Sequence, residues 1–165
     1  MYRKLFSVFF VLIFITGFET SFAQEFKVDK IDKAKLSKLI KERKGRPLFL
    51  NLWATWCVPC REEYPSIVKL AGENKDVEFV GISVDFPDEV DSKIIPFLKN
   101  HKANFTNYVN AFEGDEDLIN ALDKSWNGAL PATFIFDKTG KKIIWLEGKK
   151  SYNEFKSELE KLKKK

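Results

Sequence analysis

The most constraining feature of this sequence is a pair of cysteines placed directly after a short apolar run. The run covers residues 48–54 and has the length of a buried strand. It leads into Cys57 and Cys60, and the segment that follows, residues 58–71, has the apolar spacing of a helix, with a kink expected near Pro65. The sequence therefore predicts that both cysteines lie at the junction between a strand and a helix.

Strands and helices alternate along much of the chain, which favours a mainly parallel sheet. After Pro131 the pattern changes, because two short apolar runs flank the turn-rich residues 137–140 and indicate a hairpin. Ser151 and Glu154 form a capping-box pattern that opens a last helix. We predict an α/β fold in which helices flank a central mixed sheet, with a C-terminal antiparallel hairpin and a final helix. The other expected strands are 26–31, 77–84, 105–109, 133–136 and 142–146, and the other expected helices are 34–43, 91–102 and 116–124.

Length and charge narrow the class of protein. A chain of 165 residues is long enough to bury a core and is expected to form one domain. Its 28 basic residues are scattered among 24 acidic ones, and the net charge is only +4. Because no basic stripe alternates with aromatic residues, we do not expect nucleic acid as a partner.

The N-terminus has the pattern of a secretory signal peptide. Arg3 and Lys4 precede an apolar stretch over residues 5–15, which is shorter than a membrane-spanning helix and is followed by small residues. We expect residues 1–23 to be a cleaved signal peptide, or else an uncleaved anchor, and residues 24–165 to be the folded domain. Both interpretations place the domain outside the cytoplasm, in the periplasm or tethered on the extracytoplasmic side of the membrane, where disulfides persist.

The cysteine spacing favours redox chemistry. At the start of a helix, the thiolate of Cys57 would be stabilised by the helix dipole and by free amide groups. Cys60, one turn later, could attack a mixed disulfide on Cys57 and release the reduced product. A purely structural disulfide would close too small a loop to stabilise the fold much. A zinc site needs four ligands, whereas the chain has no second cysteine pair and one histidine, His101, so we expect no metal.

Two motifs together resemble a known family. The sequence NLWATWCVPC at residues 51–60, followed by Pro65, resembles the active-site signature of the thioredoxin-like oxidoreductases. The sequence ALPATF at residues 129–134 resembles that family's second signature. Within the family, the chain is most similar to the exported TlpA/ResA-like group, and the resemblance covers residues 47–162. It implies a thioredoxin-like domain over residues 24–165, with no cofactor besides the redox-active cysteine pair.

The resemblance also implies a substrate-binding surface around the cysteines. Pro131 is expected to form a cis peptide bond beside the pair and to help keep metals off the thiols, the alternative being an ordinary trans turn. Leu130 would then offer its main chain to a substrate strand laid beside Cys57, and Trp126 would cover this loop. The remaining expected contacts to substrate are Trp56, Val58 and Pro59.

One departure from thioredoxin itself concerns the proton acceptor. Thioredoxin has a buried aspartate six residues before its first cysteine, where this chain has Asn51. ResA-like members have a glutamate three residues after the second cysteine, a position that Glu63 occupies here. Glu63 could accept the proton of Cys60, provided that burial raises its pKa toward neutrality. The alternative is a solvated carboxylate that only suits the helix dipole, as we expect for Glu62.

The direction of electron flow stays open at this point. The resemblance favours a reductase that acts on disulfides of exported proteins, including the haem-binding cysteines of apocytochromes c, and draws electrons from a membrane thiol-transfer protein. Alternatives are an exported dithiol oxidase or isomerase, and a redox-inert adaptor that binds a partner through the same surface. A peroxiredoxin-like peroxidase is less favoured, because that group's threonine lies three residues before its reactive cysteine and Thr55 lies two before Cys57. The oligomeric state is left open.

Overall fold

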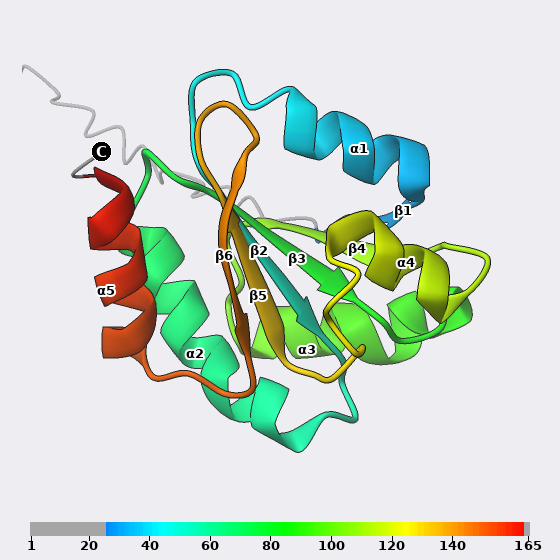
Figure 1. Ribbon diagram of the computed structural model, residues 1–165. Helices are drawn as coiled ribbons and strands as arrows, with labels where there is room; N and C mark the ends of the chain where they lie inside the picture. The colour runs from blue at the N-terminus through cyan, green and yellow to red at the C-terminus, as the bar shows by residue number, and fades with distance from the viewer. Residues whose placement is uncertain (1–25, 164–165) are drawn as a thin grey trace, which may run out of the picture.

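A six-stranded mixed sheet forms the centre of the structure, a computed structural model that describes residues 26–163 (Figure 1). The strand order is β1-β4-β3-β2-β5-β6; the first four strands are parallel, and β5 and β6 are antiparallel to their neighbours. The predicted mixed sheet with a C-terminal hairpin is therefore confirmed. The strands are β1 (Val28–Ile31), β2 (Leu48–Trp53), β3 (Glu78–Ser83), β4 (Thr106–Asn110), β5 (Ala132–Phe136) and β6 (Lys142–Glu147).

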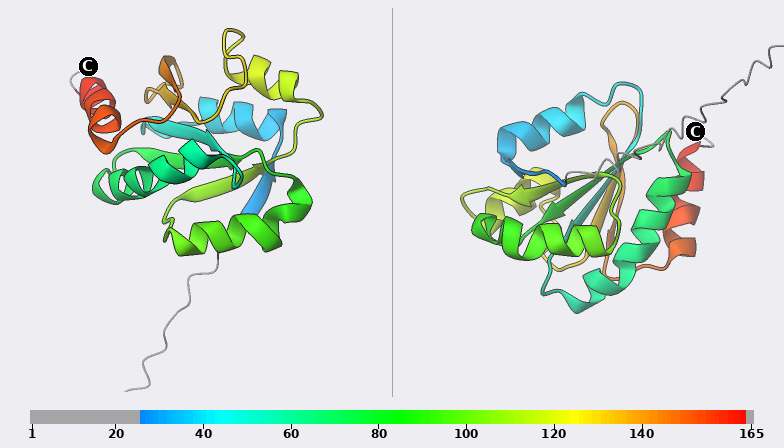
Figure 2. Two further views of the ribbon diagram at one scale, coloured as in Figure 1. Left: turned by 90° about the horizontal axis from the view of Figure 1, so that it is seen from below. Right: turned by 180° about the vertical axis from the view of Figure 1, so that it is seen from behind.

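Helices cover both faces of the sheet, as the views in Figures 1 and 2 show. Helices α1 and α4 pack on one face, while α2, α3 and α5 pack on the other, with α2 and α5 side by side. This is the thioredoxin-like arrangement that the sequence predicted. The helices are α1 (Lys33–Lys41), α2 (Val58–Glu73), α3 (Ile95–Asn100), α4 (Asp115–Leu122) and α5 (Tyr152–Lys163).

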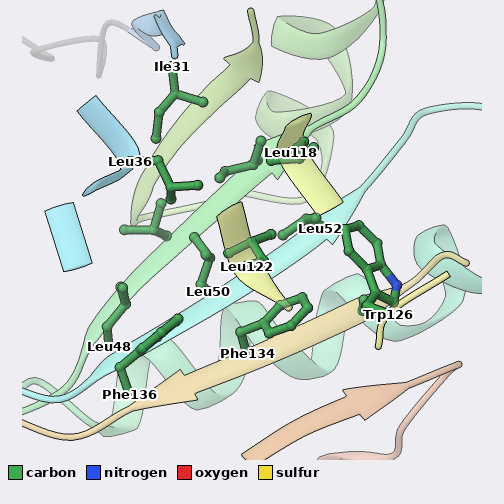
Figure 3. Packing of buried hydrophobic residues seen from close by; sticks show 13 residues of the cluster. Ile31, Leu36, Leu48, Leu50, Leu52, Leu118, Leu122, Trp126, Phe134 and Phe136 are labelled. Atoms are coloured by element: carbon green, nitrogen blue, oxygen red, sulfur yellow. The ribbon is translucent and has the colours of Figure 1, made fainter. Parts of the chain in front are cut away.

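The side chains of β2 divide between two cores. Leu48, Leu50 and Leu52 point toward α1 and α4, where they pack with α4 and β5 in the cluster of Figure 3. Phe49 and Trp53 alternate with them and pack on the opposite face. This period of two is the property of a strand buried on both sides. Asn51 interrupts the apolar pattern on the α2 face and lies at the functional site described below.

The structure corrects the predicted helix over residues 91–102. The chain instead forms a 3₁₀ turn at Pro87–Glu89, a π-helical turn at Val90–Ile94 and then α3. Pro96 has no amide hydrogen and cannot make a regular helical bond. The turn before it is wound more widely, and the amide of Ile95 donates to the carbonyl of Val90.

Other boundaries differ by a few residues. The predicted helix over residues 116–124 is too late, since α4 begins at Asp115 and ends at Leu122. Helix α2 continues through Pro65, and Figure 1 shows its first turns set at an angle to the rest. Among residues 26–163, no helix combines the length and apolar character that crossing a membrane requires. The predicted signal peptide lies outside the described residues.

Candidate active site

Cys57 and Cys60 form a disulfide at the N-terminus of α2, with 2.05 Å between their sulfur atoms. Cys57 is the N-cap residue, and its Sγ accepts a hydrogen bond from the amide of Cys60 at 3.3 Å. The two residues differ in access, because Cys57 is 6% exposed and Cys60 is fully buried. A substrate sulfur can therefore approach Cys57, while Cys60 can react only with what Cys57 holds.

The predicted substrate-binding residues surround this disulfide. Trp56 and Val58 are 64% and 58% exposed, although both are large apolar side chains. Pro59 is also exposed and occupies the second position of α2, where its missing amide hydrogen costs no helical bond. The Leu130–Pro131 peptide bond is cis, as predicted, and Leu130 packs against the core cluster that contains both cysteines.

The loop before Pro131 is held by its own polar groups. The indole nitrogen of Trp126 donates to the carbonyl of Ala129 at 3.0 Å, and the amide of Ala129 donates to Oδ1 of Asn127 at 2.9 Å. Trp126 thus holds this loop through a hydrogen bond, and the expectation that it covers Pro131 stays a prediction. No residue between 26 and 163 forms a hydrogen bond with the amide or the carbonyl of Leu130. The main chain of Leu130 is thus open to pairing with an added strand.

An apolar groove of about 510 Å³ runs beside Trp56 and Leu130. Phe86 belongs to its wall and is 73% exposed, the highest value among the large apolar side chains of residues 26–163. Exposed apolar surface of this kind is typical of a binding site. Other wall residues are Leu118, Ile119 and Trp126.

Glu63 lies on α2, three residues after the buried Cys60, and is itself buried, at 2% exposure. Its Oε1 accepts from Nδ2 of Asn51 at 3.0 Å, and its Oε2 accepts from the amide of Lys150 at 2.9 Å. Burial raises the pKa of the Glu63 carboxyl to about 7, although both hydrogen bonds act to lower it. Glu63 therefore meets the condition stated from the sequence, that burial raises its pKa toward neutrality.

Glu62 has a different environment one residue earlier. Its carboxylate is about half exposed and pairs with Nζ of Lys149 at 2.6 Å. This is the solvated position that was predicted for Glu62. The structure shows that Glu63 does not share it, because the helix turns the two side chains in different directions.

Sequence reasoning missed the partners that hold Glu63. Nδ2 of Asn51 also donates to Oγ1 of Thr133 at 3.0 Å, across the β2–β5 pairing in which the two residues are in register. A polar residue inside an apolar strand was the signal for Asn51. The backbone amide of Lys150 left no signal in the sequence, because it comes from the loop after β6. Within residues 26–163, no group of three or more His, Cys, Asp or Glu side chains is placed to hold a metal ion.

Comparison with known proteins places this site in a family. A model of the AhpC/TSA family matches residues 20–143. The chain belongs to this family. It is 30% identical over 141 residues to the thiol-disulfide oxidoreductase ResA of Bacillus cereus (strain ATCC 10987 / NRS 248), which covers 85% of this chain and 76% of that protein. ResA of Bacillus anthracis is 29% identical over 140 residues, with the same coverage.

Solved structures agree with the fold. A secreted disulfide oxidoreductase of Mycobacterium tuberculosis, homologous to DsbE of E. coli, is 25% identical with a TM-score of 0.56 and covers 72% of this chain and 83% of that chain. A thioredoxin-related protein from Neisseria meningitidis serogroup B is 26% identical with a TM-score of 0.62, covering 73% and 87%. With the Cys57–Cys60 pair at its site, this AhpC/TSA family member is a thiol–disulfide oxidoreductase of the ResA and DsbE type.

Proposed function

We propose that this protein is exported and reduces disulfides of other exported proteins, with Cys57 as the attacking residue and Cys60 as the resolving one. The observation that carries the proposal is the asymmetry of the pair. Cys57 keeps a small exposed fraction, 6%, and lies at a helix N-terminus, which stabilises its thiolate. Cys60 is fully buried, and the carboxyl of Glu63, with a pKa of about 7, lies one turn further along the same helix.

The reaction starts from the reduced pair. The Cys57 thiolate attacks one sulfur of the substrate disulfide, forms a mixed disulfide and releases the other substrate sulfur as a thiolate that takes up a proton. Cys60 then transfers its proton to the Glu63 carboxylate, and its thiolate attacks the Cys57 sulfur. The mixed disulfide breaks, the substrate leaves with both sulfurs reduced, and two electrons have passed from the pair to the substrate. The Cys57–Cys60 disulfide is the product.

The substrate is held beside Cys57 as an added strand. The open main chain of Leu130 supplies hydrogen bonds to the substrate backbone, and Pro131 shapes the turn that presents it. Exposed apolar side chains, among them Trp56 and Val58, contact the substrate side chains. Pro59 contributes to the same surface.

Export is supported by the pattern of residues 1–23 and by the secreted relative from Mycobacterium tuberculosis. The reducing direction is supported by the likeness to ResA proteins over most of the chain. By that likeness, the cysteines of apocytochromes c are the proposed substrates, and a membrane thiol-transfer protein is the proposed electron donor.

A trapping experiment tests the mechanism. In Cys60→Ala the mixed disulfide on Cys57 cannot be resolved, so substrate proteins remain attached and can be identified from the extracytoplasmic fraction. Cys57→Ala is the matched control and should retain nothing. We expect the trapped proteins to be exported proteins with oxidised cysteine pairs. Trapping that depends on Cys60 instead of Cys57 would contradict the assigned roles.

The direction is tested by the reduction potential in glutathione buffers. A value closer to that of thioredoxin, about −270 mV, than to the roughly −120 mV of DsbA supports a reductase. A strongly oxidising value would select the dithiol oxidase instead. If the reduced protein fails to reduce insulin at all, the redox-inert adaptor is the better description.

A further inference from the structure

A second buried carboxylate, Asp85, lies behind the loop that leads to Cys57. Asp85 follows β3 and is 2% exposed. Its Oδ2 accepts from the amide of Thr55 at 2.9 Å and from the hydroxyl of Ser83 at 2.5 Å. Its Oδ1 accepts from the hydroxyl of Thr55 at 2.6 Å. One backbone amide and two hydroxyls thus converge on the two oxygens of the Asp85 carboxyl group.

These bonds anchor the loop before the active site to the neighbouring strand. Thr55 lies two residues before Cys57, and it is bound to Asp85 through both its backbone and its side chain. The amide of Cys57 in turn donates to the carbonyl of Ala54 at 3.2 Å and closes a turn around Thr55. The start of α2, and with it the position of the Cys57 sulfur, is therefore set from β3.

We propose that Asp85 is a positioning residue that also biases the Cys57–Cys60 pair toward its disulfide form, so that the protein is a stronger reductant. This inference rests on the proposed function and addresses its direction. The reduced pair carries a negative charge on the Cys57 sulfur, whereas the disulfide is neutral. The negative charge of Asp85, which is bonded to Thr55 two residues before Cys57, disfavours the charged form. Destabilising the reduced form makes a dithiol more reducing.

The effect of the Asp85 charge on the Cys57 thiolate is opposite to that of other groups at the same site. The helix N-terminus and the amide of Cys60 stabilise a thiolate at Cys57. Lys93, from the π-helical turn, interacts electrostatically with Asp85 but forms its ion pair with Glu89. Other charged groups on the elements that flank the site include Arg61, Glu62 and Glu63 on α2, Asp88 after β3, and Lys149 and Lys150 after β6. Among these groups, Asp85 is the one bonded to the loop that ends in Cys57.

Asp85→Asn separates the charge from the hydrogen bonds. With the amide oxygen in the place of Oδ2, it can still accept from the backbone of Thr55 and from the hydroxyl of Ser83. The amide nitrogen, in the place of Oδ1, can donate to the hydroxyl of Thr55. The measured equilibrium converts protein dithiol and oxidised glutathione into protein disulfide and two molecules of reduced glutathione. We expect its constant to fall about tenfold in Asp85→Asn, which corresponds to a potential about 30 mV more oxidising. The alkylation of Cys57 should also reach its half-maximal rate at a lower pH.

Three further variants make the result decisive. Asp88→Asn removes an exposed charge three residues later and should match the parent. Thr55→Val keeps the Asp85 charge and removes only the hydroxyl bond, so its constant should stay within about twofold of the parent. Asp85→Ser is a second neutral replacement of smaller size, which should shift the constant in the same direction and which carries the test if the Asn variant does not fold.

The outcomes distinguish this inference from the proposed function. Equal constants for the parent and the two neutral variants would overturn the role of the Asp85 charge. A shift in Thr55→Val as large as that in Asp85→Asn would assign the effect to loop position alone and would also overturn it. If the parent itself does not exchange with glutathione, the failure belongs to the proposed function instead.

Discussion

Charged side chains are buried at both ends of the central strands, but within residues 26–163 only one of them forms a salt bridge. At the end where β2 and β3 begin, the guanidinium of Arg43 donates to the carbonyl of Leu39 at 2.6 Å and to the carboxylate of Glu78 at 2.7 Å. At the opposite end, Glu63 accepts from the neutral amides of Asn51 and Lys150. Among residues 26–163, no salt bridge joins Glu63 to a cation.

The difference separates a buried charge that is paired within the fold from the carboxyl that we propose as the proton acceptor. The carboxylate of Glu78 pairs with Arg43 and ties the segment after α1 to β3. Glu63 has donors but no salt-bridge partner among residues 26–163, and burial outweighs the more distant charges of Lys149 and Lys150, so the carboxyl has a pKa of about 7. A group in that range can both take and return a proton at the pH where the enzyme works.

The largest loss of stability is expected from Arg43→Met. The variant keeps the length of the side chain but removes its charge and hydrogen bonds, and it leaves the Glu78 carboxylate without its nearest partner. We expect the free energy of unfolding to fall by about 4 kcal/mol in denaturant titrations. The rate of disulfide reduction should not change while the protein is folded. If the free energy of unfolding falls by less than about 1 kcal/mol, or if disulfide reduction slows, Arg43 is not a purely structural charge and the contrast with Glu63 is wrong.

Glu63→Gln is expected to change how stability depends on pH. In the folded protein the pKa of Glu63 is about 7, above its ordinary 4.5, so the folded state binds this proton more tightly than the unfolded state does. Its contribution is complete below pH 4.5 and is lost as the pH rises to about 7, which amounts to about 3 kcal/mol. The neutral amide has no such loss. Unfolding of the oxidised protein from pH 4 to 8 measures the difference between the two curves.

The same variant should slow the resolving step. Without a carboxylate to take the proton of Cys60, the release of a mixed disulfide from Cys57 is expected to slow by a factor of about 100. Rapid-mixing measurements at pH 7 would show this as an accumulating intermediate. Parallel stability curves together with an unchanged release rate would leave Glu63 as a packing residue only.

Local sequence patterns were enough to predict much of this molecule. The strand over residues 48–54 and the following helix were recognised because each is encoded by adjacent residues, and Cys57 and Cys60 took their positions from that junction. The helix over residues 91–102 was predicted too regular, because apolar spacing does not report the missing amide hydrogen of Pro96. This error and the shifted bounds of the helix predicted over residues 116–124 are both local, since neither changes the order of the elements.

The surroundings of Glu63 could not be predicted in the same way. The burial of its side chain depends on the loop after β6, whose Lys150 is 87 residues away in sequence. Asn51 reaches Thr133 only because β5 returns antiparallel beside β2. Such contacts arise from topology, and no spacing within one segment encodes them.

The smallest effect is expected from Glu62→Gln, and it is the sharpest control for Glu63. Both partners of the Glu62–Lys149 pair are about half exposed, so water and salt screen their attraction. Replacing Glu62 should leave the midpoint of unfolding and the rate of mixed-disulfide release within about twofold of the parent. The two variants remove the same charge from neighbouring positions of one helix, so only the burial of the carboxylate differs between them. If Glu62→Gln slows release as much as Glu63→Gln does, negative charge near the helix start explains the rate, and proton transfer by Glu63 does not.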